Sequence, residues 1–303
     1  MPDLNALQRR IEVASDLLGI TRTMKTLAAV SIRQYEEAVE ALARYFDAVD
    51  EGLRMFFWRH RGRIRMRSPS PAAPVGLIVF GAEQGLCGGF NEQVVQAVRE
   101  HADQHRRRGC TRLEFVLVGT RLQVFAPELT GQAFAWRPLP GGVDGITPLV
   151  DELLTVLEEW RHRRRIERVE LVHQRRVHAA ATRPRVFALL PFPAEREAGQ
   201  VPSRWPGRSL PRLDLPADVL LSTLLREWLF VALYRAAAES LMAENAARIA
   251  AMQSAQRNIE ERVTELRLAY HQARQTAITE ELLEVASGFE VLRRAESDSG
   301  EKS

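Results

Sequence analysis

Residues 217–287 read ADVLLSTLLREWLFVALYRAAAESLMAENAARIAAMQSAQRNIEERVTELRLAYHQARQTAITEELLEVAS, which is 71 positions without glycine or proline. One helix of that length would run roughly 100 Å, at about 1.5 Å per residue, whereas helices in globular domains average about 11 to 12 residues. Pro216 suits the first turn of a helix, and Gly288 offers a stop signal after the stretch. The stretch therefore predicts one very long helix near the C-terminal end.

The last third of this stretch carries a narrow apolar stripe. The stripe steps by four, three, four, three and four positions and consists of Ile259, Val263, Leu266, Tyr270, Ala273 and Ala277. Such heptad spacing is typical of a coiled-coil contact with a second helix. The remaining positions are mostly Glu, Arg and Gln, so most of the helix circumference is expected to stay polar.

The N-terminal segment offers the partner for this helix. Its apolar residues step by three and four positions through Leu4, Leu7, Ile11, Ala14 and Leu18, and the pattern resumes after Gly19. The spacing predicts a helix over residues 3–58, in which Gly19 costs about 1 kcal/mol relative to alanine. Two long helices with narrow seams at opposite ends of the chain predict an antiparallel pair.

The middle of the chain alternates between strand and helix patterns. Short apolar runs predict strands at 75–80, 113–119, 168–172 and 185–190, and helices are expected to open at Asn91, as an N-cap, and at Thr147-Pro148. Such alternation predicts an α/β layer with a largely parallel sheet. The proline-rich segment 191–216 is expected to be an irregular loop.

These patterns predict a fold of the α/β class plus a long antiparallel α-helical coiled coil, with paired N- and C-terminal helices and a central Rossmann-like α/β domain. The expected divisions are an N-terminal coiled-coil helix (1–62), a central α/β domain with a proline-rich loop (63–213), a C-terminal coiled-coil helix (214–292) and a polar tail (293–303).

Composition excludes several classes of protein. The 42 basic and 39 acidic residues leave a net charge of only +3, which does not favour a nucleic-acid-binding domain. The two cysteines, Cys87 and Cys110, are too few for a disulfide scaffold and offer no paired metal-ligand spacing. The N-terminus lacks the apolar run of a signal peptide, and no segment approaches the roughly 18 to 20 apolar residues of a membrane span.

A glycine-rich turn, GAEQGLCGGFN at 81–91, is the main candidate for chemistry because it follows a strand and precedes a helix, where nucleotide-binding folds place phosphate. It lacks the lysine of a P-loop and the G-x-G-x-x-G spacing. A tight structural turn involving Gly85, Cys87, Gly88 and Gly89 is the favoured interpretation, and Cys87 has no recognisable histidine base. A nucleotide-binding α/β enzyme with a helical appendage stays open as the alternative.

Two arginine clusters, at 54–67 and 161–165, could contact phosphates, which leaves a nucleic-acid binder as a third interpretation. Aromatic residues precede the first cluster instead of interleaving with it, so a solvated connector or a contact with an acidic partner is favoured. The glutamates of the long C-terminal helix lie on a shaft without a concave site. The sequence thus predicts no catalytic residue, no cofactor and no metal ligand.

Three segments of this sequence resemble the gamma subunit of F-type ATP synthases. GLCGGFN at 85–91 is similar to the central signature of that family, residues 243–288 are similar to its C-terminal helix, and RRIEVASDLLGITRTMKTLAA at 9–29 is similar to its N-terminal helix. The three segments follow in the family's order and cover both chain ends.

The resemblance implies a rotor shaft, not an enzyme. The paired helices would stand inside a ring of alternating alpha and beta subunits, and the α/β domain would lie against the epsilon subunit and the c-ring. Ion flow through the c-ring would turn the shaft and drive the catalytic beta subunits through their conformations. The expected location is the cytoplasmic face of a bacterial cell membrane, reached only through the c-ring, with no nucleic acid as partner.

The resemblance also assigns residues by position. The expected contacts with beta subunits are Met24, Arg248, Arg274, Gln275, Thr279, Glu281 and Glu284. Arg274 and Gln275 match the family's ARQ motif. This chain departs from the family at Lys25, where an acid is usual, and at Ser31, where lysine is usual. These departures point to a divergent bacterial member of the alternate (N-type) branch.

Overall fold

The computed structural model describes residues 4–60, 69–70, 72–130, 134–177, 181–192 and 215–300, without the side chains of 130 and 289–300. The chain divides into two compact units. The first comprises residues 1–25 and 252–303, and the second comprises residues 26–251. Two long helices, α1 (Leu4–Arg59) and α6 (Ala217–Gly300), contribute to both units.

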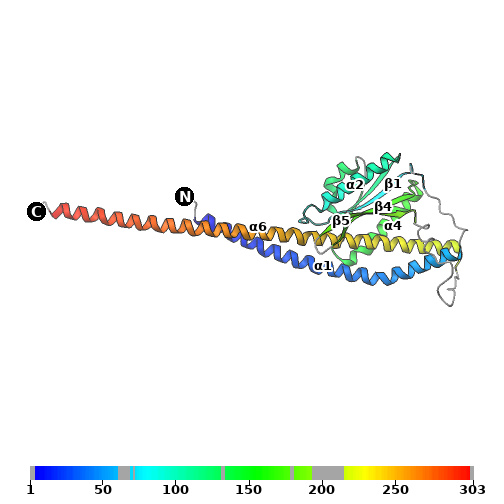
Figure 1. Ribbon diagram of the computed structural model, residues 1–303, viewed down its shortest axis with the longest axis horizontal. Coiled ribbons are helices and arrows are strands. Elements are labelled where there is room, and N and C mark those ends of the chain that lie inside the picture. The colour runs from blue at the N-terminus through cyan, green and yellow to red at the C-terminus, as the bar shows by residue number, and fades with distance from the viewer. Residues whose placement is uncertain are drawn as a thin grey trace. The chain divides into compact units, whose positions relative to one another are not determined.

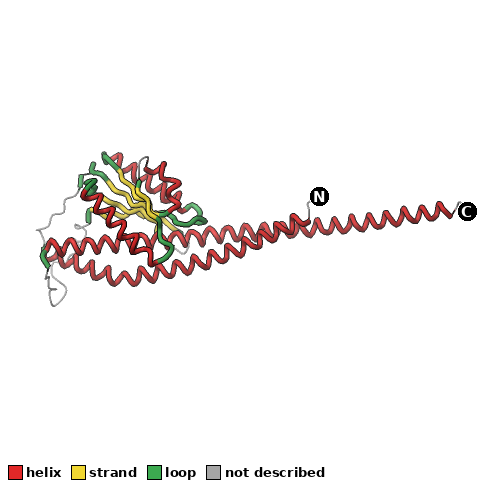
Figure 2. The backbone as a smooth tube through the Cα atoms, turned by 180° about the vertical axis from the view of Figure 1, so that it is seen from behind, coloured by secondary structure: helices red, strands yellow, loops and turns green. Residues whose placement is uncertain are grey.

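The first unit is built from one end of α1 and one end of α6, which run antiparallel (Figures 1 and 2). Lys25 Nζ donates to Gln256 Oε1 over 2.9 Å, and Arg22 lies 3.9 Å from Glu260. Within the heptad stripe of α6, Val263 and Leu266 are buried and the other four members are half-buried. The predicted antiparallel pairing of the N- and C-terminal helices is therefore confirmed.

Helix α6 passes the stop signal at Gly288 and the predicted end of the coiled-coil helix at residue 292, and it continues to Gly300. Among the described residues, no atom of another segment lies within 4 Å of a Cβ placed at Gly288, so none of them redirects the chain there. Glycine can adopt helical dihedrals at a cost of about 1 kcal/mol relative to alanine, and the helix continues through it.

The second unit contains a five-stranded sheet in the order β3-β2-β1-β4-β5. Its strands are β1 (Val75–Phe80), β2 (Leu113–Val118), β3 (Ala135–Arg137), β4 (Arg168–Arg176) and β5 (Thr182–Leu190). The first four in spatial order run parallel, as predicted, whereas β5 pairs antiparallel with β4 and makes the sheet mixed.

Helices cover both faces of this sheet (Figures 1 and 2). The helices of the domain are α2 (Phe90–Arg107), α3 (Ala126–Thr130) and α4 (Ile146–His162), with 3₁₀ turns η1 (Thr120–Phe125) and η2 (Val143–Gly145). Leu77 and Val79 of β1 pack toward α2, whereas Ile78 and Phe80 pack toward α4 and the segments of α1 and α6 in this unit. Strand alternation thus sends successive side chains into two separate cores.

Asn91 does not cap α2 as the sequence predicted. The helix begins one residue earlier, at Phe90, and Gly89 occupies the cap position without a side-chain bond. The Asn91 side chain is buried, and its Oδ1 accepts a hydrogen bond from the backbone N–H of Ala82 over 2.9 Å. It therefore closes the turn after β1 instead of satisfying the start of the helix.

Several expectations fall outside the described residues. They are the basic connector at 61–68, most of the predicted loop at 193–214, and the last three residues of the predicted polar tail. Among the residues that are described, no helix combines the length and the apolar character that crossing a lipid bilayer requires.

Candidate functional site

The end of α6 extends beyond the start of α1 in the first unit (Figure 1). The contacts of Lys25 with Gln256 and of Arg22 with Glu260 set the antiparallel register. Continuing that register places Leu4, the first residue of α1, near Ala277. The part of α6 that follows Ala277 therefore has no α1 residue opposite it.

This terminal part of α6 presents both apolar and polar side chains to solvent. Ile278, Leu282 and Val285 follow helical spacing and are 47%, 65% and 58% exposed. The residues expected to contact a beta subunit here are all exposed, namely Arg274, Gln275, Thr279, Glu281 and Glu284. An exposed apolar stripe with polar residues beside it is typical of a surface that binds another protein.

Met24 is not brought together with that surface. It is half-buried on α1, in register with about Arg257 of α6. At about 1.5 Å per residue, Arg257 stands roughly 25 Å along the helix from Arg274. Lys25, one of the departures from the family pattern, bonds to Gln256 across the helix pair. The predicted contacts of the first unit therefore form two surfaces along the helix pair.

Arg248 belongs to the second unit and has a different environment from the other predicted contacts. Its side chain is buried, its Nη1 donates to Asn245 Oδ1 over 2.8 Å, and its Nη2 donates to Glu244. Its Nε also donates to the carbonyl oxygen of Gly85 over 3.4 Å. These bonds fasten the glycine-rich turn to α6, and the contact of Arg248 with a beta subunit stays a prediction.

The same turn is held by a carboxylate on α6. The backbone N–H groups of Glu83 and Gln84 donate to the two oxygens of Glu244 over 3.0 and 3.1 Å. These donors sit after a strand and before a helix, where a nucleotide phosphate would bind. Because an anionic side chain of this chain already accepts their hydrogen bonds, the geometry argues against a nucleotide site at the turn.

The glycines and Cys87 shape this turn. Gly88 adopts a φ of +59°, a left-handed conformation that glycine accepts without the penalty of a Cβ. Cys87 is buried, and burial, reinforced by the nearby Glu244 charge, raises the pKa of its thiol to about 11. The thiol is therefore protonated at neutral pH, which removes the thiolate that nucleophilic chemistry needs.

Glu83 fixes the other side of the turn. Its carboxylate accepts hydrogen bonds from the backbone N–H groups of Thr120 and Leu139, each over 2.9 Å, and from the Thr120 hydroxyl over 2.6 Å. The sequence analysis did not identify Glu83 or Glu244 as functional residues. Their positions in the sequence give no sign that their carboxylates accept hydrogen bonds from distant backbone N–H groups.

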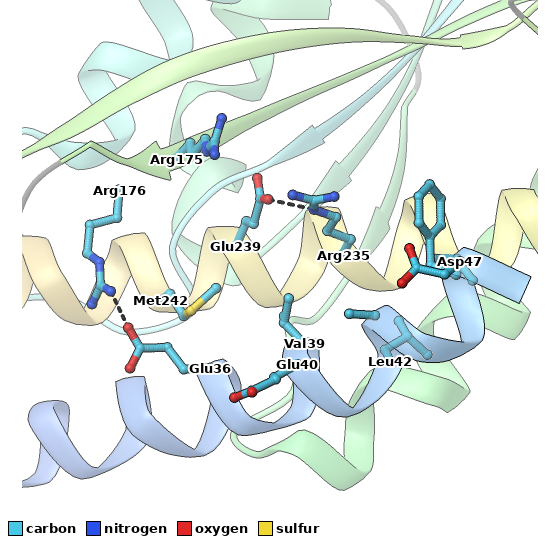
Figure 3. Close-up of a pocket in the computed structure, with 13 residues that line it drawn as sticks. Glu36, Val39, Glu40, Leu42, Asp47, Arg175, Arg176, Arg235, Glu239 and Met242 are labelled. Atoms are coloured by element: carbon cyan, nitrogen blue, oxygen red, sulfur yellow. Dashed lines mark hydrogen bonds and ion pairs between the residues drawn. The ribbon is translucent and has the colours of Figure 1, made fainter. Parts of the chain in front are cut away.

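A groove of about 510 Å³ lies between α1, α6 and the end of β4 in the second unit (Figure 3). An ion pair between Arg176 and Glu36 bridges β4 and α1, and Arg235 Nε donates to Glu239 Oε1 over 2.9 Å within α6. His173 Nε2 of β4 lies 3.0 Å from Glu239 Oε2. Charged contacts thus connect the C-terminal half of β4 to both long helices inside this unit.

The pKa of Glu239 predicts an acid-sensitive contribution to stability. Burial opposes its ionisation, but the hydrogen bonds from His173 and Arg235 outweigh burial and lower the pKa from 4.5 to about 2. A lowered pKa stabilises the fold fully above pH 4.5, and the gain is lost as the pH falls toward 2. We expect Glu239→Gln to lower the free energy of unfolding by about 3 kcal/mol at pH 5, and by much less near pH 2.

Urea unfolding at several pH values measures this effect as the difference in the free energy of unfolding between the parent chain and Glu239→Gln. Glu40→Gln is the matched control, because Glu40 lines the same groove but is exposed. If the difference in the free energy of unfolding between the parent chain and Glu239→Gln stayed constant from pH 5 to pH 2, it would contradict the lowered pKa of Glu239.

One described arginine in each of the two clusters forms ion pairs with carboxylates of this chain. In the first cluster, Arg54 pairs with Asp50 over 2.8 Å. In the second, Arg164 pairs with Glu114 over 2.9 Å and lies 3.6 Å from Glu159. These carboxylates offset the positive charge that contact with nucleic-acid phosphates would need.

Comparisons with known proteins agree along nearly the whole chain. A family model described as ATP synthase matches residues 3–292. The ATP synthase gamma chain of Nostoc sp. (strain PCC 7120) is 29% identical over 320 residues, which cover 96% of this chain and 100% of the relative. The ATP synthase gamma chain of Acaryochloris marina is 30% identical, with coverage of 96% and 100%.

Two solved structures share the fold. A chain in the rotor of Euglena gracilis mitochondrial ATP synthase, rotational state 1, has a TM-score of 0.59 at 16% identity and covers 91% of this chain and 98% of its own length. A chain in the OSCP/F1/c-ring structure of the same enzyme, rotational state 3, has a TM-score of 0.63 at 15% identity, with coverage of 97% and 95%. From the family model and the nearly full-length relatives, this chain belongs to the gamma-chain family of ATP synthases.

Proposed function

We propose that this chain is the central rotor shaft of an F-type ATP synthase, which couples ion flow through a membrane c-ring to conformational changes in catalytic beta subunits. The observation that carries the proposal is the end of α6 beyond Ala277, which has no α1 residue opposite it and exposes Ile278, Leu282 and Val285. Exposed apolar side chains on a helix end are best explained by a surrounding protein surface.

The helix pair of the first unit suits a part that turns inside a sleeve. Its internal contact is a narrow seam at Val263 and Leu266, and most other positions of α6 in this unit are polar and exposed. Because α1 and α6 have different sequences, each surrounding subunit would meet different side chains. Different contacts with each subunit would shift the populations of its conformations, which is what coupling between rotation and nucleotide affinity requires.

The partners follow from this role. We propose that Met24, Arg274, Gln275, Thr279, Glu281 and Glu284 contact beta subunits, that alpha and beta subunits form the sleeve, and that the α/β domain binds the epsilon subunit and the c-ring. The chain would then sit at the cytoplasmic face of a bacterial membrane, held there through the c-ring. Catalysis would belong to the beta subunits, in line with the Glu244 carboxylate that occupies the donors of the glycine-rich turn.

A single-molecule rotation assay tests the proposal on the assembled alpha–beta–gamma complex. A cysteine introduced at exposed Arg108 would carry the probe, in a chain whose half-buried Cys110 is replaced by serine. Cys87 can stay, because its buried thiol has a raised pKa and reacts slowly. We expect unidirectional rotation driven by ATP. Assembly without rotation, or failure to assemble with alpha and beta subunits, would count against the rotor role.

In the same assay, Arg274→Ala combined with Gln275→Ala should weaken coupling without unfolding the helix. Each 1.36 kcal/mol of lost transition-state stabilisation lowers a rate about tenfold, so the loss of contacts that contribute about 1 kcal/mol should lower ATP turnover by the complex about fivefold. Thr264→Ala with Glu265→Ala is the matched control, because both residues are exposed on the same helix and lie between the two predicted contact surfaces. Equal turnover by the two double variants would remove the special role of the 274–284 surface.

A further inference from the structure

Two histidines and a glutamate converge between α2 and β4 in the second unit. His101 and His105 are four residues apart on α2, so their side chains leave the same face of the helix. His105 Nε2 lies 2.9 Å from Glu170 Oε2 of β4 and 3.2 Å from His101 Nε2. His101 Nε2 contacts the same oxygen of Glu170, and the three ligand atoms lie within 4.8 Å of one another.

We propose that His101, His105 and Glu170 bind one divalent transition-metal ion of the zinc class. Zinc binds imidazole nitrogens at about 2.0–2.1 Å, so a tetrahedral site holds two such nitrogens about 3.3 Å apart. The observed separation of 3.2 Å between the Nε2 atoms is close to that value. The mixed nitrogen and oxygen ligands also disfavour calcium and magnesium, which prefer oxygen ligands alone.

Burial supports a partly enclosed site. The His105 side chain is 2% exposed, that of Glu170 is 11% exposed and that of His101 is 21% exposed. The His101 side therefore gives an ion access from solvent, and three protein ligands leave a fourth position for water. A divalent ion would replace the hydrogen bonds that now join both histidines to Glu170. Its charge would offset that of the partly buried carboxylate.

The environment of His105 sets the expected affinity of the site for a metal ion. The outer nitrogen of His105, Nδ1, is buried without a hydrogen-bond partner among the described residues. Histidine ligands are normally supported by such a bond, and its loss costs about 10–100-fold in affinity. We therefore expect micromolar affinity. The bound ion would fasten the last turns of α2 to strand β4.

The test uses the untagged full-length chain, stripped of metal with a chelator and titrated with zinc chloride by calorimetry. We expect one ion per chain and a higher melting temperature with zinc. His101→Gln and Glu170→Gln should each lower the affinity at least about 100-fold, since they remove direct ligands. His162→Gln is the matched control, because His162 is an exposed histidine on α4, and it should leave the affinity unchanged.

Cobalt absorption keeps the test decisive even when a variant folds poorly. On the parent chain, cobalt should give the intense visible bands of a four-coordinate site, and zinc should displace it. Weak octahedral cobalt bands, the absence of saturable zinc binding, or equal zinc affinity in the parent chain and a folded His101→Gln variant would each overturn the proposal. In that case the three residues form only a hydrogen-bonded cluster.

Discussion

Proline in place of Leu266 should break α6 in the middle of its contact with α1. Leu266 is 8% exposed and lies in the seam of the first unit, where a small hollow is lined by it together with Ala14 and Leu17 of α1. Proline removes a helical hydrogen bond and clashes with the preceding turn, which costs about 3 kcal/mol or more. Loss of the buried leucine side chain adds about 2–5 kcal/mol. We expect a large drop in far-ultraviolet circular dichroism and in melting temperature.

Two further variants separate the backbone effect from the packing effect. Leu266→Ala keeps the helix and removes only the side chain, so it should cost less than the proline. Leu282→Pro breaks the same helix beyond the start of α1, at a leucine that is 65% exposed, and should leave the helix pairing intact. The paired-helix assignment would fail if Leu266→Pro had the same melting temperature and circular dichroism as the parent chain. It would also fail if these values matched those of Leu282→Pro.

The long helices could be predicted because their signal is local. Heptad spacing around Val263 and Leu266 shows which face of α6 is buried without reference to any distant residue, and the same holds for Leu7 on α1. The end of α6 was harder to predict, because a single glycine such as Gly288 weakens a helix without ending it when nothing packs against it.

The sequence predicted a largely parallel sheet but assigned no orientation to β5, because the lengths of the last two strands were not known. Sequence patterns placed the two strands at 168–172 and 185–190, which leaves room for a crossover connection. The structure extends β4 to Arg176 and starts β5 at Thr182. Antiparallel strands can be joined by such a short link, whereas parallel strands need a dozen or more residues. Knowing the full strand lengths would therefore have predicted the antiparallel edge.

The polar networks could not be predicted, because they join residues far apart in the chain. Glu244 bonds to Glu83 and Gln84 across about 160 positions, and it looks in the sequence like any solvated glutamate of a long helix. The histidine pair at 101 and 105 did carry a signal, since two histidines four apart share one helix face. Its third member, Glu170, was hidden in a strand pattern.

Glu244→Ala should be among the most destabilising single changes in the second unit. Glu244 and Arg248 are both buried, with side chains 3% and 6% exposed. Removing one partner of a buried ion pair leaves an uncompensated charge and costs about 3–5 kcal/mol. The variant also leaves the N–H groups of Glu83 and Gln84 without their acceptor. Urea unfolding followed by the fluorescence of Trp136, Trp160 and Trp228, all in this unit, measures the loss.

A double variant, Glu244→Met with Arg248→Met, divides this loss into its two sources. Replacing a whole buried ion pair by apolar residues is often neutral or stabilising, because no charge is left behind. The part-buried N–H donors of Glu83 and Gln84 would still lack their carboxylate, and each lost hydrogen bond costs about 0.5–1.5 kcal/mol. We therefore expect the double variant to recover part of the stability that Glu244→Ala loses, but not all of it. Full recovery of stability would mean that the turn does not depend on Glu244. No recovery would mean that the cost of Glu244→Ala does not come from the unpaired charge of Arg248.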